Sequence, residues 1–118
     1  MRKIYIVEDD NNIMEVLEIF LNLENFEVYS FLSIKQFGER DRNVTPDIYL
    51  FDVNLPDGSG VELCNQIKKD TKSEDIPVII MSAHANLQTL ADQCQPDELI
   101  PKPFDLDSLL SSIKSVIK

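Results

Sequence analysis

The chain has 118 residues, enough for one domain with one core, and its 43% hydrophobic and 27% charged residues are ordinary for a soluble globular protein. The net charge of −10 disfavours a domain that binds nucleic acid or an anionic membrane by itself, because phosphate groups would repel it. The apolar runs are too short to span a bilayer, and the opening "MRKIYIV" leads directly into acidic residues, which argues against a signal peptide.

Short apolar runs alternate with stretches of helical periodicity along the chain. In chain order they predict a strand at 3–7, a helix at about 12–23, a strand at 27–31, a short helix from the cap Ser33 to about Arg40, a strand at 48–51, a helix within 58–70, a strand at 77–81, a helix marked by 87–94, a strand at 98–100 and a last helix capped by Asp105. The apolar stripe expected on the first helix is Ile13, Val16, Leu17, Phe20 and Leu21.

The two cysteines, Cys64 and Cys94, form no C-x-x-C pair and fall at core-facing positions of predicted helices. We interpret both as reduced core thiols of a cytoplasmic protein, where disulfides are rare.

Five strands alternating with five helices predict an α/β fold with an open parallel sheet covered on both faces. Among such folds we expect the flavodoxin-like (βα)5 arrangement, three layers deep, with strand order 2-1-3-4-5. Sites in these sheets lie beyond the carboxyl ends of the strands, where the strand order reverses.

Polar residues stand where the central strands end. Glu8, Asp9 and Asp10 follow the first strand, Asp52 ends the third and Ser82 follows the fourth, while Lys102 comes after the fifth. Taken singly, most of these residues have an ordinary structural interpretation. Asp10 can be a helix cap, Ser82 a loop hydroxyl and Lys102 a solvated surface charge. Asp52 is harder to dismiss, because a carboxylate beside the apolar run "IYLF" is costly unless something pairs with it.

Together these residues favour a site for phosphoryl transfer. Glu8, Asp9 and Asp52 would crowd carboxylates at one point, a conflict that a divalent cation such as Mg²⁺ or Mn²⁺ removes. Lys102 and the Ser82 hydroxyl can then serve an anion that shares the site. An aspartate can itself be the nucleophile that carries the phosphoryl group.

Four motifs resemble the receiver domain of two-component response regulators. They are "IYIVEDD", "DIYLFDVNLPDGSG", "IPVIIMSAHA" and "IPKPF", and they occur in the family's order over essentially the whole chain. The resemblance implies that a histidine kinase or phosphotransfer protein phosphorylates Asp52. It also implies that Asp9, Asp52 and the Asn54 backbone carbonyl bind Mg²⁺ directly, with Glu8 acting through water.

The same resemblance assigns the remaining positions. Lys102 would contact the phosphoryl group, and Ser82 would turn inward to bond it and move the loop that follows. Asn54 and His84 occupy the positions that tune the lifetime of the phosphoryl group. The Lys102–Pro103 peptide bond would be cis.

The chain departs from the family pattern at Leu99, where an aromatic residue is usual, so a rotamer switch built on a ring is not expected. Gln95-Pro96 also stands where a glycine is common. The resemblance therefore says least about the output surface around the fourth helix, fifth strand and fifth helix. The same holds for the phosphorylation-dependent homodimer that family members often form through this face. We treat 1–118 as one receiver domain, either working alone or as the N-terminal part of a longer regulator.

Three other functions also use some of these features. A metal-dependent phosphatase of the haloacid dehalogenase type also uses an aspartyl nucleophile, but it requires a second aspartate at the position that Asn54 occupies here. A flavodoxin would place a flavin phosphate after the first strand, where Glu8, Asp9 and Asp10 would repel it. A degenerate receiver acting only as an interaction module conflicts with the complete set of site residues.

Overall fold

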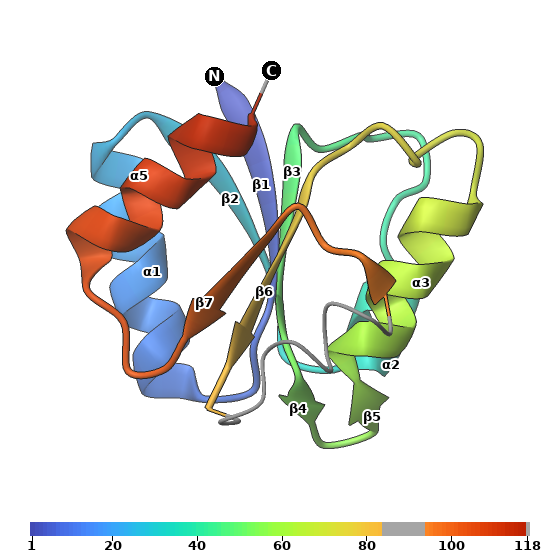
Figure 1. Cartoon of the computed structure of the whole chain (residues 1–118), viewed down its shortest axis with the longest axis horizontal. Helices are drawn as coiled ribbons and strands as arrows, with labels where there is room; N and C mark the ends of the chain where they lie inside the picture. The colour runs from blue at the N-terminus through green and yellow to red at the C-terminus, as the bar shows by residue number, and fades with distance from the viewer. Residues whose placement is uncertain (84–93, 118) are drawn as a thin grey trace.

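The computed structural model describes residues 1–83 and 94–117 as an alternation of strands and helices (Figure 1). The elements are β1 (Arg2–Val7), α1 (Asn11–Leu23), β2 (Phe26–Phe31), α2 (Ile34–Gly38), β3 (Ile48–Asp52), β4 (Asn54–Leu55), β5 (Gly58–Ser59), α3 (Gly60–Lys69), β6 (Val78–Ser82), β7 (Glu98–Pro101) and α5 (Leu106–Val116). The helix expected at 87–94 lies outside the described residues, apart from Cys94. No helix in the described ranges is both long and apolar enough to cross a membrane.

Five strands form one parallel sheet in the order β2-β1-β3-β6-β7. Helices α1 and α5 lie on one side of this sheet, and α2 and α3 lie on the other (Figure 1). The expected three-layer, doubly wound fold with strand order 2-1-3-4-5 is confirmed, β6 and β7 being its fourth and fifth strands. The order reverses between β1 and β3, so the carboxyl ends of these two strands define the predicted position of a site.

The core divides into two clusters because successive strand residues point to opposite faces of the sheet. On β3, Tyr49 and Phe51 pack with Phe37 of α2 and with the apolar side of α3. Ile48 and Leu50 pack on the opposite face, against α1 and α5. With both faces covered, all five residues of β3 are buried, including the terminal Asp52.

Three helices begin at the side-chain caps that the sequence predicts. The Asp10 carboxylate accepts hydrogen bonds from the Asn12 and Ile13 backbone N–H groups at 2.9 and 3.2 Å. Ser33 Oγ caps α2 and the Asp105 carboxylate caps α5. Asp10 therefore caps the N-terminus of α1, in agreement with its ordinary structural interpretation.

Two predicted details are wrong. Val16 is 49% exposed, because α1 turns Met14, Leu17 and Leu21 toward the sheet and leaves Val16 on the solvent side. Helix α2 ends at Gly38 rather than near Arg40, because the Arg40 N–H bonds back to the Phe37 carbonyl, only three residues earlier.

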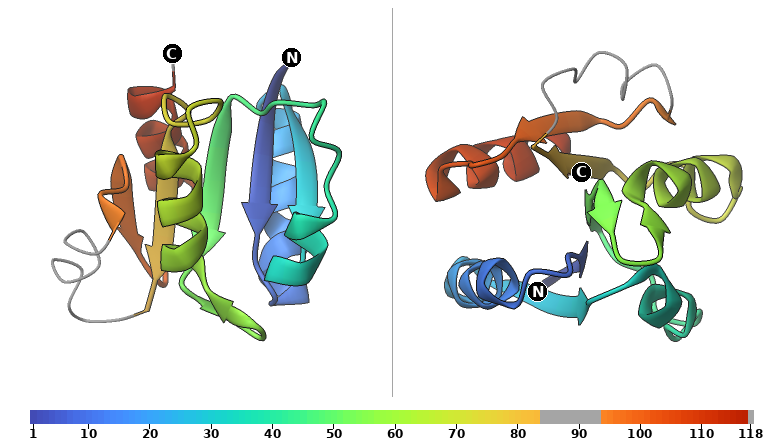
Figure 2. Two further views of the ribbon diagram at one scale, coloured as in Figure 1. Left: turned by 90° about the vertical axis from the view of Figure 1, so that its right-hand side faces the viewer. Right: turned by 90° about the horizontal axis from the view of Figure 1, so that it is seen from below.

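A small hairpin replaces the beginning of the helix expected within 58–70. Strands β4 and β5 pair antiparallel and project beyond the carboxyl edge of the sheet, and α3 begins only at Gly60 (Figure 2). Gly58 has φ of 155°, a conformation that glycine adopts far more readily than other residues.

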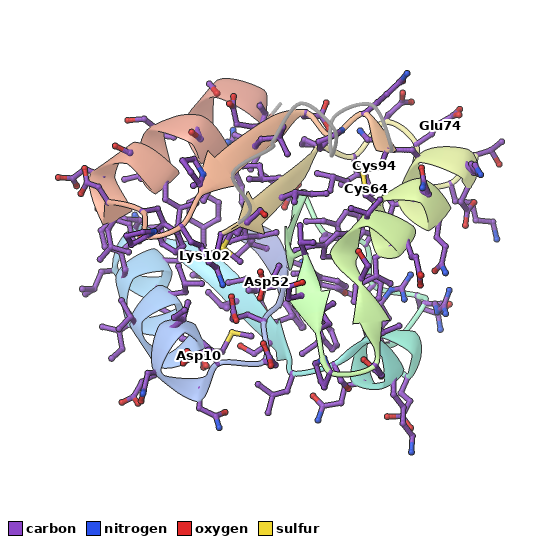
Figure 3. The ribbon with its side chains drawn as sticks, turned by 60° about the horizontal axis from the view of Figure 1, so that its bottom comes forward. Asp10, Asp52, Cys64, Glu74, Cys94 and Lys102 are labelled. Carbon is purple, nitrogen blue, oxygen red and sulfur yellow. The ribbon has the colours of Figure 1, made fainter. Side chains whose placement is uncertain are left out.

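Both cysteines are buried and neither is part of a disulfide, as the sequence predicts. The Cys64 thiol donates to the Cys94 backbone carbonyl across 3.4 Å, and the two side chains are neighbours in Figure 3. Burial raises the pKa of both thiols, which keeps them protonated and poorly nucleophilic.

Candidate functional site

The sheet topology gathers the predicted polar residues at one edge. Glu8 follows β1, Asp52 ends β3, Ser82 ends β6 and Lys102 follows β7. Because these four strands are neighbours in one parallel sheet, their carboxyl ends meet. Figure 3 shows Asp52 and Lys102 pointing toward each other at this edge.

Three carboxylates form the centre of the site. Glu8, Asp9 and Asp52 each place an oxygen within 4.8 Å of the others. Glu8 is 1% exposed and Asp52 6% exposed, whereas Asp9 is open to solvent. Two of the three negative charges are therefore largely removed from water, which is costly unless cations compensate them.

Lys102 provides part of that compensation. Its Nζ lies 2.7 Å from Glu8 Oε2 and 3.3 Å from Asp52 Oδ2. Its backbone N–H donates to the Ser82 carbonyl at 2.8 Å, which extends the pairing of β6 with β7 and fixes where the side chain starts. The Lys102–Pro103 peptide bond is cis, the isomer that the resemblance implies.

Burial and pairing act on the protonation of this pair. Burial raises the pKa of Glu8, while the hydrogen bonds from Lys102 and from the Asp10 backbone oppose that rise. Burial acts to lower the pKa of Lys102, but Glu8 and then Asp52 outweigh it, and the pKa is raised. Lys102 therefore remains a cation at neutral pH.

The donor set fits a small divalent cation. Three carboxylates facing one ammonium leave an excess of negative charge, and all the available ligand atoms are oxygens. Mg²⁺ prefers such hard ligands and keeps several waters, which the exposed Asp9 side of the cluster allows.

The backbone of Asp52 packs closely against Gly60, a residue that sequence reasoning did not identify. A Cβ added to Gly60 would overlap the main-chain oxygen of Asp52 and lie 2.9 Å from its carbonyl carbon. The Gly60 N–H also bonds to the Val53 carbonyl at 3.0 Å. Only glycine allows α3 to begin so close to the end of β3.

Asp57 is a second contributor that sequence reasoning did not identify. Its two carboxylate oxygens accept hydrogen bonds from the Ile34 and Lys35 N–H groups, both at 2.9 Å. These contacts tie the β4–β5 hairpin, and with it the exposed Asn54, to the first turn of α2. "PDGSG" signals a turn, but the partners of Asp57 lie 22 and 23 residues earlier and leave no local pattern.

Two other predicted residues remain to be placed. His84 lies outside the described residues. Leu99 is a partly buried residue of β7 that packs against the core cluster on the α2 and α3 side.

Comparison with known families gives one match over nearly the whole chain. A family model for the response regulator receiver domain matches residues 4–114. The response regulator ArlR of Staphylococcus saprophyticus is 32% identical over 120 residues, which cover 100% of this chain and 53% of that protein. The transcriptional regulatory protein KdpE of Staphylococcus aureus is 32% identical over 97% of this chain and 49% of its own length. The chain thus spans about half the length of these relatives.

Solved structures agree in fold over the whole chain. The response regulator TrrA of Thermotoga maritima, in complex with Mg²⁺-BeF, superposes with a TM-score of 0.86 at 25% identity, covering 99% of this chain and 100% of that one. The non-phosphorylated HemR receiver domain of Leptospira biflexa gives a TM-score of 0.86 at 30% identity, covering 100% of this chain and 95% of that one.

Proposed function

This chain belongs to the response regulator receiver domain family, and on that premise we propose that Asp52 accepts the phosphoryl group. A receiver domain of a two-component response regulator is a signalling switch. The observation that carries the proposal is the placement of Asp52, buried at the end of β3, grouped with Glu8 and Asp9 and 3.3 Å from the Lys102 ammonium.

The chemical step is a nucleophilic displacement at phosphorus. An Asp52 carboxylate oxygen attacks the phosphoryl group of a phosphohistidine, so an O–P bond forms while the donor's P–N bond breaks and its electron pair returns to the imidazole. Lys102 stands close enough to both Glu8 and Asp52 to shift toward a phosphoryl oxygen without crossing the site. We propose that the domain also catalyses the later loss of its own phosphoryl group to water.

Mg²⁺, for which Mn²⁺ can substitute, is the cofactor that we propose for this site. Asp9, Asp52 and the Asn54 backbone carbonyl would hold it directly, and Glu8 would act through water. When bound, such a cation supplies positive charge to the phosphoryl oxygens.

The switch that we propose runs from Asp52 to the surface around the fourth helix, β7 and α5. The Ser82 hydroxyl bonds the new phosphoryl group and draws the following segment with it. Ser82 and Lys102 are already joined through their backbones, so both can respond to one added charge. Asn54 and His84 tune the phosphoryl lifetime, and with Leu99 in place of a ring the switch works without an aromatic rotamer.

The donor that we propose is a sensor histidine kinase or a phosphotransfer protein in the cytoplasm. An apolar pocket of about 500 Å³ lies beside the site, lined by Lys102 and by Ile13, Val16, Phe104 and Leu106 among others. Ile19, three residues after Val16 on α1, is also an exposed apolar residue, at 59%. A donor protein that covers this surface would exclude water from the transfer and present its phosphohistidine next to Lys102.

We propose residues 1–118 as one receiver domain, working either alone or as the N-terminal part of a longer regulator, since the relatives named above are about twice as long. Its output, including dimerisation through the fourth-helix face, would then depend on the rest of that regulator. The phosphatase alternative has no support beside this family assignment, and Asn54 stands where that mechanism needs a second aspartate.

Intact-mass spectrometry with acetyl phosphate and Mg²⁺ tests the proposal. Wild type should gain the mass of one phosphoryl group, and Asp52→Ala should gain none. Asp47→Ala is the matched control, because Asp47 is an exposed aspartate just before the other end of β3. Equal labelling of Asp52→Ala and wild type would overturn the assignment.

A further inference from the structure

Two arginines in the segment between α2 and β3 form no ion pair with a carboxylate of the described residues. Across the described parts of the chain, the ion pairs involve Lys3, Lys68 and Lys102, and neither Arg40 nor Arg42 takes part in one. This is unexpected in a chain with 21 acidic and 11 basic side chains, where a basic group has many potential partners.

Arg40 is held in place by contacts that carry no negative charge. Its guanidinium lies 3.9 Å from the centre of the Phe37 ring and donates to the Phe37 carbonyl at 2.9 Å. Burial, followed by the charge of Arg42, lowers the pKa of Arg40. A half-buried guanidinium beside a second one is costly, and the contacts with Phe37 and Tyr49 compensate it only through neutral groups.

Capping the end of α2 accounts for only part of this arrangement. Arg40 bonds the Phe37 carbonyl, and Arg42 reaches the Gly38 carbonyl at 3.4 Å. Each guanidinium has five N–H donors, so these bonds leave most of them for other acceptors.

The two arginines line a cleft of about 220 Å³ near the edge at which the strands begin. The segment after α2 and the loop after α3 form its sides, and Lys72 and Thr45 also line it. Asp70 is the acidic residue of the lining, and one of its oxygens already accepts the Lys72 N–H at 2.9 Å. Three cations against one carboxylate make the cleft basic within an acidic domain.

The size and charge of the cleft point to one class of ligand. A volume of about 220 Å³ is below the range of pockets for drug-sized molecules, so it suits a single anionic group. Planar guanidinium groups pair with phosphate oxygens through two parallel hydrogen bonds, and a lysine adds a point charge. We propose that Arg40, Arg42 and Lys72 form a binding site for a small phosphate-bearing anion, separate from the Asp52 site at the other end of the sheet.

An NMR titration of the whole chain with inorganic phosphate tests this site. Metal-free buffer at constant ionic strength keeps phosphate away from the acidic cluster. We expect saturable shifts confined to the amides of 40–46 and 70–73, and weaker binding of acetate. Arg42→Gln should weaken phosphate binding about tenfold or more, because it removes a charged bidentate donor.

Two further variants make the result interpretable. Arg2→Gln removes the remaining arginine of the chain, at an exposed position outside the cleft, and should leave binding unchanged. Asp70→Asn should tighten binding, because it removes the opposing charge. Arg42 is exposed, so its substitution should not disturb the core. Equal phosphate affinity in Arg42→Gln and wild type, a response that never saturates, or equal binding of acetate would each overturn the proposal.

Discussion

The two ends of the sheet carry opposite charge, and they manage it differently. At the carboxyl edge, Glu8 and Asp52 are almost fully buried and share Lys102. Near the amino edge, Arg40 and Arg42 border an open cleft and pair with no carboxylate among the described residues. The first arrangement is compact and only partly compensated from within, and the second is basic and open.

The direction of the chain explains which charge lies where. In a parallel α/β sheet the helices begin near the carboxyl ends of the strands, where their free N–H groups favour negative charge. They end near the opposite edge, where free carbonyl groups favour cations, as Arg40 and Arg42 illustrate at the end of α2. The direction of the helices thus makes the carboxyl edge of the sheet the more favourable place for an added negative charge.

Gly60→Ala should produce the largest change, because the new Cβ would overlap the Asp52 carbonyl in a region of rigid backbone. We expect it to lower the free energy of unfolding by more than about 3 kcal/mol, at or above the upper end of overpacking effects. Urea denaturation measures this.

Gly38→Ala is the matched control for that change, since Gly38 ends α2 and a Cβ there meets nothing within 4 Å. We expect it to stabilise the protein by about 0.5 kcal/mol through the backbone entropy of the unfolded chain. Similar losses in the two variants would contradict the special role of Gly60.

Lys102→Met should come next, with a loss of about 2–3 kcal/mol in metal-free protein. It leaves the buried Glu8 without its cation, a change that typically costs about 3–5 kcal/mol, and protonation of Glu8 recovers part of that cost. Mg²⁺ should restore part of the stability, because the cation replaces the missing charge.

Lys68→Met provides the comparison, because the Lys68–Asp97 pair is more exposed and lies where β7 begins. Its cost should stay within about 1 kcal/mol and should not respond to Mg²⁺. Thermal unfolding of both variants with and without Mg²⁺ decides this, and equal Mg²⁺ responses would contradict our account of the cluster.

How much of this was predictable differs between the two edges. The strand order and the grouping of Glu8, Asp52 and Lys102 followed from apolar runs that end in polar residues, a pattern local to each strand. The core face of α1 was only partly predictable, because Met14 and Val16 are both apolar and only packing decided that Met14 is the buried one.

Features that depend on partners distant in the chain could not be predicted from the sequence. Asp57 acts on the first turn of α2, and Gly60 matters because of the Asp52 carbonyl. The cleft needs Lys72 beside two arginines that precede it by 30 and 32 residues. None of these pairings has a spacing rule, so they appear only when the chain is folded.

Asp57→Ala should have a smaller and more local effect. Losing two acceptors leaves the Ile34 and Lys35 N–H groups without their partner, so their hydrogen exchange should accelerate while that of core strands stays unchanged. Asp47→Ala removes a comparable exposed acceptor, that of the Lys3 N–H, and should leave α2 unaffected.

The smallest expected effect is on the pH dependence of that same contact. The hydrogen bonds from the Ile34 and then the Lys35 N–H hold the pKa of Asp57 below its ordinary value of 3.8. A lowered carboxyl pKa stabilises the fold above pH 3.8, and this contribution is lost as the pH falls through the folded-state value. The amide shifts of Ile34 and Lys35 should therefore titrate with a midpoint below pH 3.8. A midpoint above pH 3.8 would contradict the stabilising role of these two hydrogen bonds.

Locating the phosphoryl group tests the central claim most directly. Wild-type protein treated with acetyl phosphate and Mg²⁺ can be digested at low temperature and its peptides sequenced by mass spectrometry. We predict a single modified residue, Asp52, with Asp9, Asp10 and Asp57 unmodified. Phosphate on any of those three neighbours, with Asp52 unmodified, would contradict the account.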